Sequence, residues 1–242
     1  MRFAKTPSPS VGGHGLHART AVSARIGAAG CLHEVYAEPA DWAAATIFAL
    51  TALRSAQSEA KAEPVLLCHS AKMGLPARLY GQGLIALGIA PERLLFVHTR
   101  SGLEMLRAGV EAARCRGIAA VLLEIWGPCP EWTLTASRRL SLAAEQSGVT
   151  VLVLRGNARE QPSAAQTRWR VASAPSTALP ANAPGLAAID VELLRQRGGP
   201  AGMRWRLEWD ARHGNFSETP LPGAVVPLSG LRADTLGLSR AA

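Results

Sequence analysis

The sequence predicts an α/β fold in which a mostly parallel sheet carries helices on both faces. The first observation is a set of five short, mainly apolar runs, at residues 31–36, 64–69, 93–98, 118–125 and 149–154. Strands buried on both faces have this composition, because neither face needs polar side chains. The second observation is that helix-like segments separate the runs, which is typical of parallel strands joined by crossover helices.

The chain has 242 residues, of which 48% are hydrophobic and 18% charged, so it is globular and can bury one sizeable core. The expected helices begin at recognisable positions. An Ala-rich helix runs from Trp42 to about residue 57, with Asp41 as its N-cap. Ser101 opens a second helix, and Thr133 or Thr135 opens the next one.

The last third of the chain changes to the pattern of antiparallel strands. Residues 167–171 alternate polar and apolar side chains, which predicts a strand exposed on one face. A hairpin is expected from residues 189–197 and 203–210, with Trp205 and Trp209 on the same face of its second strand. We therefore expect antiparallel strands to extend the parallel sheet.

Composition divides the chain into three parts. Residues 1–27 are rich in Gly, Ser, Pro and Ala without periodicity, which predicts a disordered basic arm. Residues 28–216 are expected to form a single core domain. Residues 217–242 contain several prolines and predict a flexible tail.

The net charge of +8 is unevenly distributed along the chain. Residues 1–30 carry +4, residues 31–136 carry −1 and residues 137–242 carry +5. Basic flanks suit nucleic acid or an acidic partner protein. A solvated surface in an arginine-rich chain explains them equally well.

The sequence predicts a soluble, cytoplasmic protein with no membrane partner. The first residues have no apolar stretch of the signal-peptide type. The longest uncharged helical run, residues 42–53, falls short of the ~20 residues that a membrane helix needs. The four cysteines are widely spaced without a C-x-x-C pair, so we expect reduced thiols.

Standard catalytic and cofactor-binding motifs are missing from the sequence. Only three of the 26 basic side chains are lysines and none follows a glycine, so the phosphate loop G-x-x-x-x-G-K-[ST] does not occur. H-E-x-x-H and G-x-S-x-G are absent, and no G-x-G-x-x-G follows the first strand. His14 and His17 form an H-x-x-H pair, which we interpret as part of the arm rather than as a metal site. We expect no metal, no cofactor and no enzymatic activity.

The turn between the first strand and the Ala-rich helix lies where nucleotide-binding sheets hold phosphate. In such sheets, glycines let backbone amides close on the phosphate at the helix N-terminus. Here no glycine occurs between Gly30 and Gly74, and the turn offers the carboxylates of Glu38 and Asp41 instead. These carboxylates would repel a phosphate and could satisfy the free helix amides themselves.

These residues carry a resemblance to RecA. Residues 30–36 and the Ala-rich helix resemble its Walker-A strand and helix, with the glycine-lysine loop replaced. Residues 118–124 look like its Walker-B strand, with Glu124 near the carboxylate position, and residues 191–216 resemble its late hairpin. The resemblance implies a RecA-like three-layer core and a degenerate nucleotide site, made up of Ala37, Glu38, Asp41, Trp42 and Glu124.

A closer resemblance is to the ImuA family, RecA-like and SulA-related accessory proteins of bacterial damage-inducible mutagenesis. It covers roughly residues 30–216 and is carried by residues 33–37, 79–84, 134–140, 167–171 and 193–199. It implies a non-catalytic accessory protein of the SOS response that bridges the partners of a translesion-synthesis mutasome. The implied partners are an ImuB-like polymerase-family protein and an error-prone replicative-type polymerase, with RecA and DNA as further candidates.

Similarity to RecA also locates candidate DNA contacts. The connections at residues 127–132 and 156–166 take the positions of its DNA-contacting loops. Arginines beside Trp132 and Trp169 could hold phosphate while the rings stack on bases. The alternative is that Trp169 packs in the sheet and the arginines pair locally. The candidate arginines are Arg138, Arg139, Arg155, Arg159, Arg168 and Arg170.

Two other functions remain open at this point. A SulA-like inhibitor of cell division would bind a tubulin-like protein rather than DNA. A divergent RecA-like ATPase would bind nucleotide without the phosphate-loop lysine.

Overall fold

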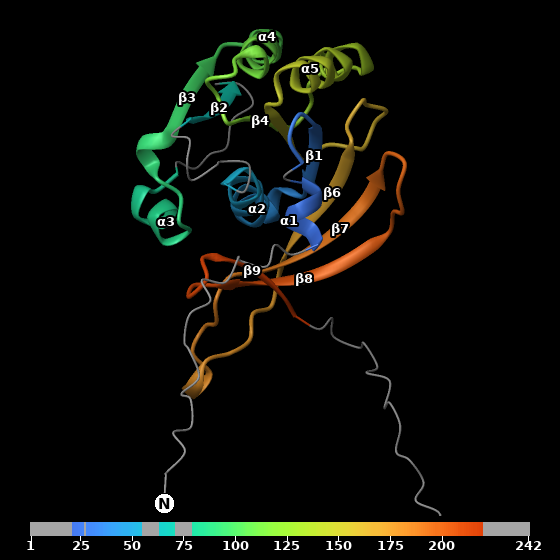
Figure 1. Ribbon diagram of the computed structural model, residues 1–242. Coiled ribbons are helices and arrows are strands. Elements are labelled where there is room, and N and C mark those ends of the chain that lie inside the picture. Colours follow the sequence, from blue (N-terminus) through green and yellow to red (C-terminus); the bar gives the residue numbers. More distant parts are fainter. Residues whose placement is uncertain (1–20, 27, 55–62, 71–78, 220–242) are drawn as a thin grey trace, which may run out of the picture.

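The computed structural model describes residues 21–26, 28–54, 63–70 and 79–219 (Figure 1). Its strands are β1 (Leu32–Ala37), β2 (Val65–Ser70), β3 (Leu94–Thr99), β4 (Ala120–Trp126), β5 (Thr150–Gly156), β6 (Thr167–Ala174), β7 (Ala188–Gln196), β8 (Met203–Asp210) and β9 (Asn215–Thr219). Its α-helices are α1 (Ala21–Ile26), α2 (Trp42–Arg54), α3 (Gly81–Ala86), α4 (Gly102–Arg114) and α5 (Leu134–Ser147). Short 3-10 helices are η1 (Pro39–Asp41), η2 (Pro91–Arg93) and η3 (Pro180–Asn182).

The strands form one sheet in the order β3-β2-β4-β5-β1-β6-β7-β8-β9. Strands β1 to β6 pair in parallel, and β7 to β9 continue the sheet antiparallel. The predicted fold class is therefore confirmed. One detail differs, because β6 lies parallel to β1 and is the last parallel strand rather than part of the antiparallel extension. The connection of residues 157–166 makes this possible, because it returns the chain from the carboxyl end of β5 to the amino end of β6 without a helix.

Each face of the sheet has its own core, and Figure 1 shows α2 on one side and α4 and α5 on the other. Helix α2 packs on β1, β5 and β6, where Phe48 and Trp169 are buried. Helices α4 and α5 cover β2, β4 and β5 around Met105 and Leu140. Strands β1, β4 and β5 are buried on both faces, as their apolar composition predicts. The prediction fails for β3, which lies at the edge of the sheet and leaves Leu95 and Phe96 exposed.

The structure corrects the expected start of the core. Residues 21–26, assigned to the disordered arm by composition, form α1. Val22 and Ile26, four residues apart on one helix face, are each 1% exposed and join the core of the α2 face. The guanidinium carbon of Arg25 lies 5.7 Å from the ring centroid of Trp205. A six-residue helix is too short to show periodicity, so composition concealed it. Residues 1–20, with His14 and His17, lie outside the described residues.

The other boundary also moves. Strand β9 extends to Thr219, past the expected end of the core at residue 216. Its Phe216 packs edge-on against Trp209, with 5.3 Å between the ring centroids. The remainder of the expected tail, residues 220–242, lies outside the described residues.

Side-chain caps fix the starts of α4 and α5. The Ser101 hydroxyl accepts a hydrogen bond from the Glu104 N–H, which confirms the predicted start of α4. Of the two threonines left open for α5, Thr133 is the N-cap, because its hydroxyl accepts a hydrogen bond from the Ala136 N–H at 3.2 Å.

Candidate functional site

The connection between β1 and α2 contains no phosphate cradle. Residues 38–41 alone separate Ala37 from Trp42, whereas the phosphate-loop motif is twice as long. Pro39 has no N–H to offer, and the Asp41 N–H donates to the Glu38 carbonyl at 2.9 Å. Two of the four residues of this connection therefore have no free N–H for an anion.

The carboxylate of Asp41 joins this turn to the sheet. Its Oδ1 accepts a hydrogen bond from the Ser173 N–H of β6 at 2.8 Å. The expectation that Asp41 caps α2 is thereby corrected. Glu38 likewise precedes η1 without a side-chain capping bond. Both carboxylates remain beside the helix N-terminus, where a phosphate would otherwise sit.

The indole ring of Trp126 fills the space next to this turn. Ala37, Gly156 and Trp126 form one row across β1, β5 and β4. A Cβ built on Gly156 would lie 1.9 Å from Cε3 of Trp126, so the ring rests directly on the glycine backbone. Trp126 packs against the core of the α2 face. The ring therefore occupies the face of the sheet on which the β1–α2 turn lies.

Glu124 lies two residues before Trp126 on β4 and faces the same side. Its side chain is 6% exposed, and its Oε1 has no hydrogen-bond partner in the part of the chain that the structure describes. Burial raises the pKa of Glu124 to about 7. A carboxyl group that is half-protonated at neutral pH is a poor fixed charge. Strand β5 separates it from β1 and the turn.

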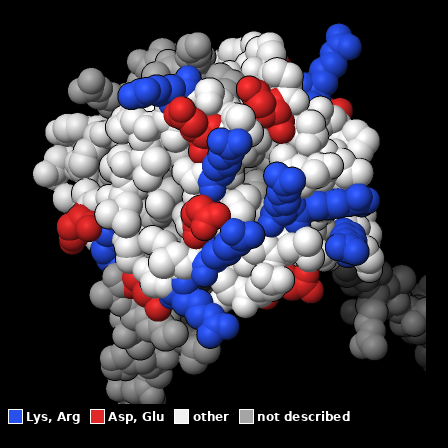
Figure 2. All heavy atoms as spheres, turned by 90° about the horizontal axis from the view of Figure 1, so that it is seen from above, with Lys and Arg blue, Asp and Glu red and all other residues white. Residues whose placement is uncertain are grey.

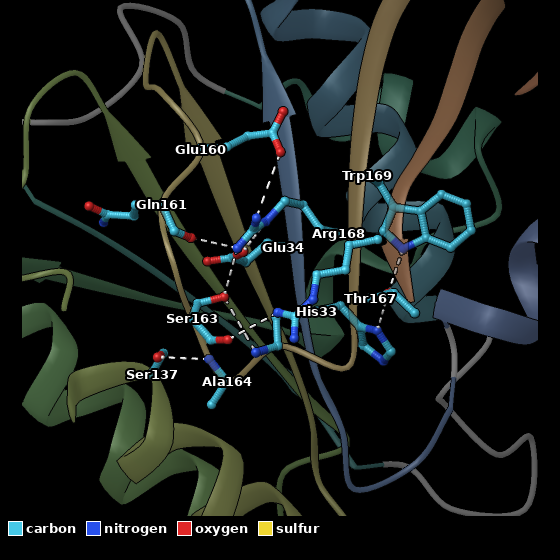
Figure 3. Close-up of polar contacts among 12 residues, drawn as sticks. His33, Glu34, Ser137, Glu160, Gln161, Ser163, Ala164, Thr167, Arg168 and Trp169 are labelled. Carbon is cyan, nitrogen blue, oxygen red and sulfur yellow. Dashed lines mark hydrogen bonds and ion pairs between the residues drawn. The ribbon is translucent and has the colours of Figure 1, made fainter. Parts of the chain in front are cut away.

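A second polar cluster lies on the α4–α5 face of the sheet (Figure 3). Glu34 of β1 is fully buried, and its Oε2 accepts a hydrogen bond from Nε of Arg168 at 2.8 Å. Its Oε1 accepts a second one from the indole N–H of Trp132 at 3.1 Å. Arg168 in turn donates through Nη2 to the Gln161 carbonyl at 2.6 Å and the Ser163 hydroxyl at 3.1 Å. The cluster thus joins β1, β6 and both connections that resemble DNA-contacting loops.

Further hydrogen bonds hold the 157–166 connection. The Ser137 hydroxyl of α5 accepts a hydrogen bond from the Ala164 N–H at 3.0 Å. The Gln161 side-chain amide donates to the Trp132 carbonyl at 2.7 Å, which links the two connections directly. The 157–166 connection is therefore fixed to α5, β6 and its neighbouring connection.

On the α2 face, a matching chain of hydrogen bonds joins β1 to β6. The Thr167 hydroxyl lies 2.7 Å from Nδ1 of His33 and accepts a hydrogen bond from the indole N–H of Trp169 at 2.6 Å. Burial lowers the pKa of His33 to about 4, so the imidazole is neutral at physiological pH. His33 therefore has a structural role.

Ion pairs continue from the buried cluster across the outer face of the antiparallel strands. Arg170 pairs with Glu160 at 2.7 Å and with Glu192 at 3.2 Å. Glu192 also pairs with Arg204 at 3.1 Å. The charged side of these strands is therefore largely neutralised by its own carboxylates.

The structure does not bring the six candidate arginines together. Arg155 and Arg168 are 4% and 8% exposed, so the expectation that residues 167–171 form a strand open on one face fails at Arg168. Arg170 is exposed and paired, whereas Arg138, Arg139 and Arg159 are exposed. The alternative interpretation is confirmed for Trp169, which is fully buried, and for the local pairing of Arg168 and Arg170. DNA contact by the exposed arginines stays a prediction.

Glu34 and Trp126 were not among the site residues predicted from the sequence. Glu34 gave a usable signal, because a carboxylate inside a buried strand almost always has a partner. No comparable signal identified Arg168 as that partner, since residues 34 and 168 meet only when β6 pairs with β1. Trp126 gave no signal, because its ring packs on Gly156, and these two residues lie side by side only when β4 pairs with β5.

The fold is that of RecA-like proteins. The crystal structure of the RadB recombinase matches with a TM-score of 0.54 and 17% identity, covering 80% of this chain and 95% of that one. No protein-family model matches the chain.

The predicted resemblance to ImuA is confirmed by sequence. Protein ImuA from two strains of Caulobacter vibrioides is 38% identical over an alignment of 150 residues, and the match covers 57% of this chain. The match spans 59% of those curated relatives. No helix among the described residues has the length and apolarity to cross a membrane.

Proposed function

We propose that the protein is a non-catalytic, RecA-like accessory factor of bacterial damage-inducible mutagenesis. In the cytoplasm, as part of the SOS response, it bridges an ImuB-like polymerase-family protein and an error-prone replicative-type polymerase during translesion synthesis. RecA and DNA are further candidate ligands. The observation that carries the proposal is the β1–α2 connection, where a RecA-like fold retains the strand and helix without phosphate-binding residues.

The chemistry of that connection supports a binding role over a catalytic one. A phosphate would meet the carboxylates of Glu38 and Asp41 without a lysine, and neither Pro39 nor Asp41 has a free N–H to offer it. The Trp126 ring and the buried Glu124 occupy the adjacent face. Similarity to ImuA supports the place of this binding role in mutagenesis.

The bridging role is tested with purified components. The chain is mixed with a purified ImuB-like protein, and the complex is measured by size-exclusion chromatography and biolayer interferometry. We expect a complex with a Kd of about 1 μM or tighter, unchanged by ATP. The polymerase should join this complex only when the chain is present. Absence of any complex at tens of micromolar protein would overturn the bridging role.

Two further measurements separate the alternatives. ATP turnover should not exceed that of the buffer, and a turnover abolished by Glu124→Gln would indicate a divergent ATPase. Overexpression should change the frequency of damage-induced mutation. Filamentation of cells with an unchanged mutation frequency would indicate a SulA-like inhibitor of division.

A further inference from the structure

Helices α4 and α5 lie side by side and point the same way along the sheet. Each follows a parallel strand and starts at the carboxyl edge, where Ser101 and Thr133 cap them. Their buried residues face the sheet, which leaves one outer surface spanning both helices. Figure 2, which views the molecule from this side, shows arginines standing out from that surface with carboxylates between them.

The outer surfaces of the two helices combine leucines with arginines at helical spacing. On α4, Leu103 and Arg107 are four residues apart and share one side of the helix, as do Arg138 and Leu142 on α5. Leu103 is 46% exposed and Leu142 is 56% exposed. We call these four residues the leucine–arginine patch.

The arginines of the patch are free to bind. Arg107 and Arg138 are exposed and have no ion-pair or hydrogen-bond partner among the residues that the structure describes. The acids of α4 are engaged elsewhere, since Glu111 pairs with Arg114 at 2.9 Å and Glu104 accepts from the Arg100 N–H. The N-terminal ends of both helices add to the positive potential.

We propose that the leucine–arginine patch is a docking surface for an acidic, leucine-containing helical segment of a partner protein. The unpaired guanidinium groups would bind carboxylates, and the two exposed leucines would be covered by apolar side chains of the segment. Exposed leucines on two adjacent parallel helices suit an amphipathic helix whose apolar side chains recur every three to four residues.

A protein segment fits the patch better than nucleic acid. Neither α4 nor α5 contains an aromatic residue, so the patch has no ring on which a base could stack. Its exposed leucines gain nothing from phosphates and gain from burial against another apolar surface.

The test measures binding of fluorescent probes to the full chain by anisotropy. The first probe is a synthetic peptide of about 18 residues with Leu at helical spacing and Glu elsewhere. The second replaces every Glu by Lys, and the third is oligo-dT of similar length. We expect the Leu/Glu peptide to bind at least about tenfold more tightly than either other probe, with affinity that falls as salt rises.

Variants assign the binding to the patch. Arg107→Glu with Arg138→Glu should weaken Leu/Glu peptide binding by about tenfold or more. The charge-matched control, Arg197→Glu with Arg212→Glu in exposed turns outside the helices, should change it by less than about twofold. Leu142→Ser should weaken binding about fivefold without altering its salt dependence. Circular dichroism confirms that each variant is folded.

Three outcomes would overturn the proposal. One is equal binding of the Leu/Glu and Leu/Lys peptides, and another is an equal effect of the patch and control reversals. The third is tighter binding of oligo-dT that is lost on the patch reversal, which would make this a nucleic-acid surface. None of these outcomes depends on complex formation with the ImuB-like protein, so the two proposals fail separately.

Discussion

Glu34 lies in a six-residue strand that is buried along its whole length. A carboxylate in that position is stable only with its bonds to Arg168 and Trp132. Arg168 is thereby committed to the interior, although its place in an alternating segment favours a surface role. Arg168 was expected to contact DNA. Instead, its hydrogen bonds position the connection before β6.

Removing one member of this buried pair should therefore cost far more than removing an exposed pair. Glu34→Leu removes the buried partner of the Arg168 guanidinium and leaves it the longer pair with Glu160 at 3.7 Å, and we expect the free energy of unfolding to fall by about 3–5 kcal/mol. The double variant Glu34→Leu with Arg168→Met should recover much of that loss. Urea denaturation measures both. Glu111→Ala, which breaks the exposed pair with Arg114, is the control and should cost about 0.5 kcal/mol or less.

If Glu34→Leu lowered the free energy of unfolding by no more than Glu111→Ala does, the buried pair would contribute no more to stability than an exposed one. The same result would reopen Arg168 as a surface contact.

Glu124 should make stability depend on pH in a direction opposite to most carboxylates. Burial raises its pKa from 4.5 in the unfolded chain to about 7. The folded state then binds more protons between these values, so the free energy of unfolding falls as pH rises from about 4.5 to 7. Glu124→Gln removes this titration. As pH rises from about 4 to about 8, the free energy of unfolding of the variant should increase by roughly 3 kcal/mol relative to that of the wild type.

Urea denaturation of both proteins at several pH values measures the difference. His33 titrates in the same range with the opposite slope, because its pKa is lowered, and it cancels between the two proteins. A difference that does not vary with pH would show that Glu124 is ionised in the folded state.

At the scale of elements, strands and helices could be predicted because their signals are local. Apolar runs located the strands, and hydroxyl residues before periodic segments located α4 and α5. The direction of β6 could not be predicted in this way, because it depends on which strand lies beside it. Helix α1 was missed since its only signal is one pair of buried residues, Val22 and Ile26.

The choice between the two threonines of α5 can be measured directly. Thr133→Ala removes the acceptor of the Ala136 N–H and should lower the free energy of unfolding by about 1 kcal/mol. Thr135→Ala, an exposed change inside the first turn, should be neutral or slightly stabilising, since alanine has the higher helix propensity. Urea midpoints of both variants decide the matter. Equal losses would contradict the assigned cap.

At the scale of the whole molecule, the location of the candidate site could be predicted from the sequence more completely than the set of residues that form it. The β1–α2 turn and its carboxylates followed from the missing Gly-Lys step in the sequence. The packing of the Trp126 ring on Gly156 and the hydrogen bonds of the 157–166 connection could not be predicted in this way, because each joins strands or segments that are distant in sequence. The sequence also could not show where the basic charge of the second half lies. Part of it is neutralised by ion pairs on the antiparallel strands, whereas Arg138 and Arg139 of α5 have no partner among the described residues.

The extent of the folded unit can be tested with two isoleucines of the same size. Ile26 is 1% exposed and packs in the core of the α2 face, whereas Ile85 of α3 is 55% exposed. If α1 belongs to the cooperative fold, Ile26→Ala leaves a cavity beneath the antiparallel strands and lowers the free energy of unfolding by about 2–4 kcal/mol. Ile85→Ala should change it by about 0.5 kcal/mol or less. Urea denaturation followed by tryptophan fluorescence reports both, because Trp205 and Trp169 lie in or against that core. Equal, small effects would return residues 21–26 to the arm and place the start of the folded core where composition alone had put it.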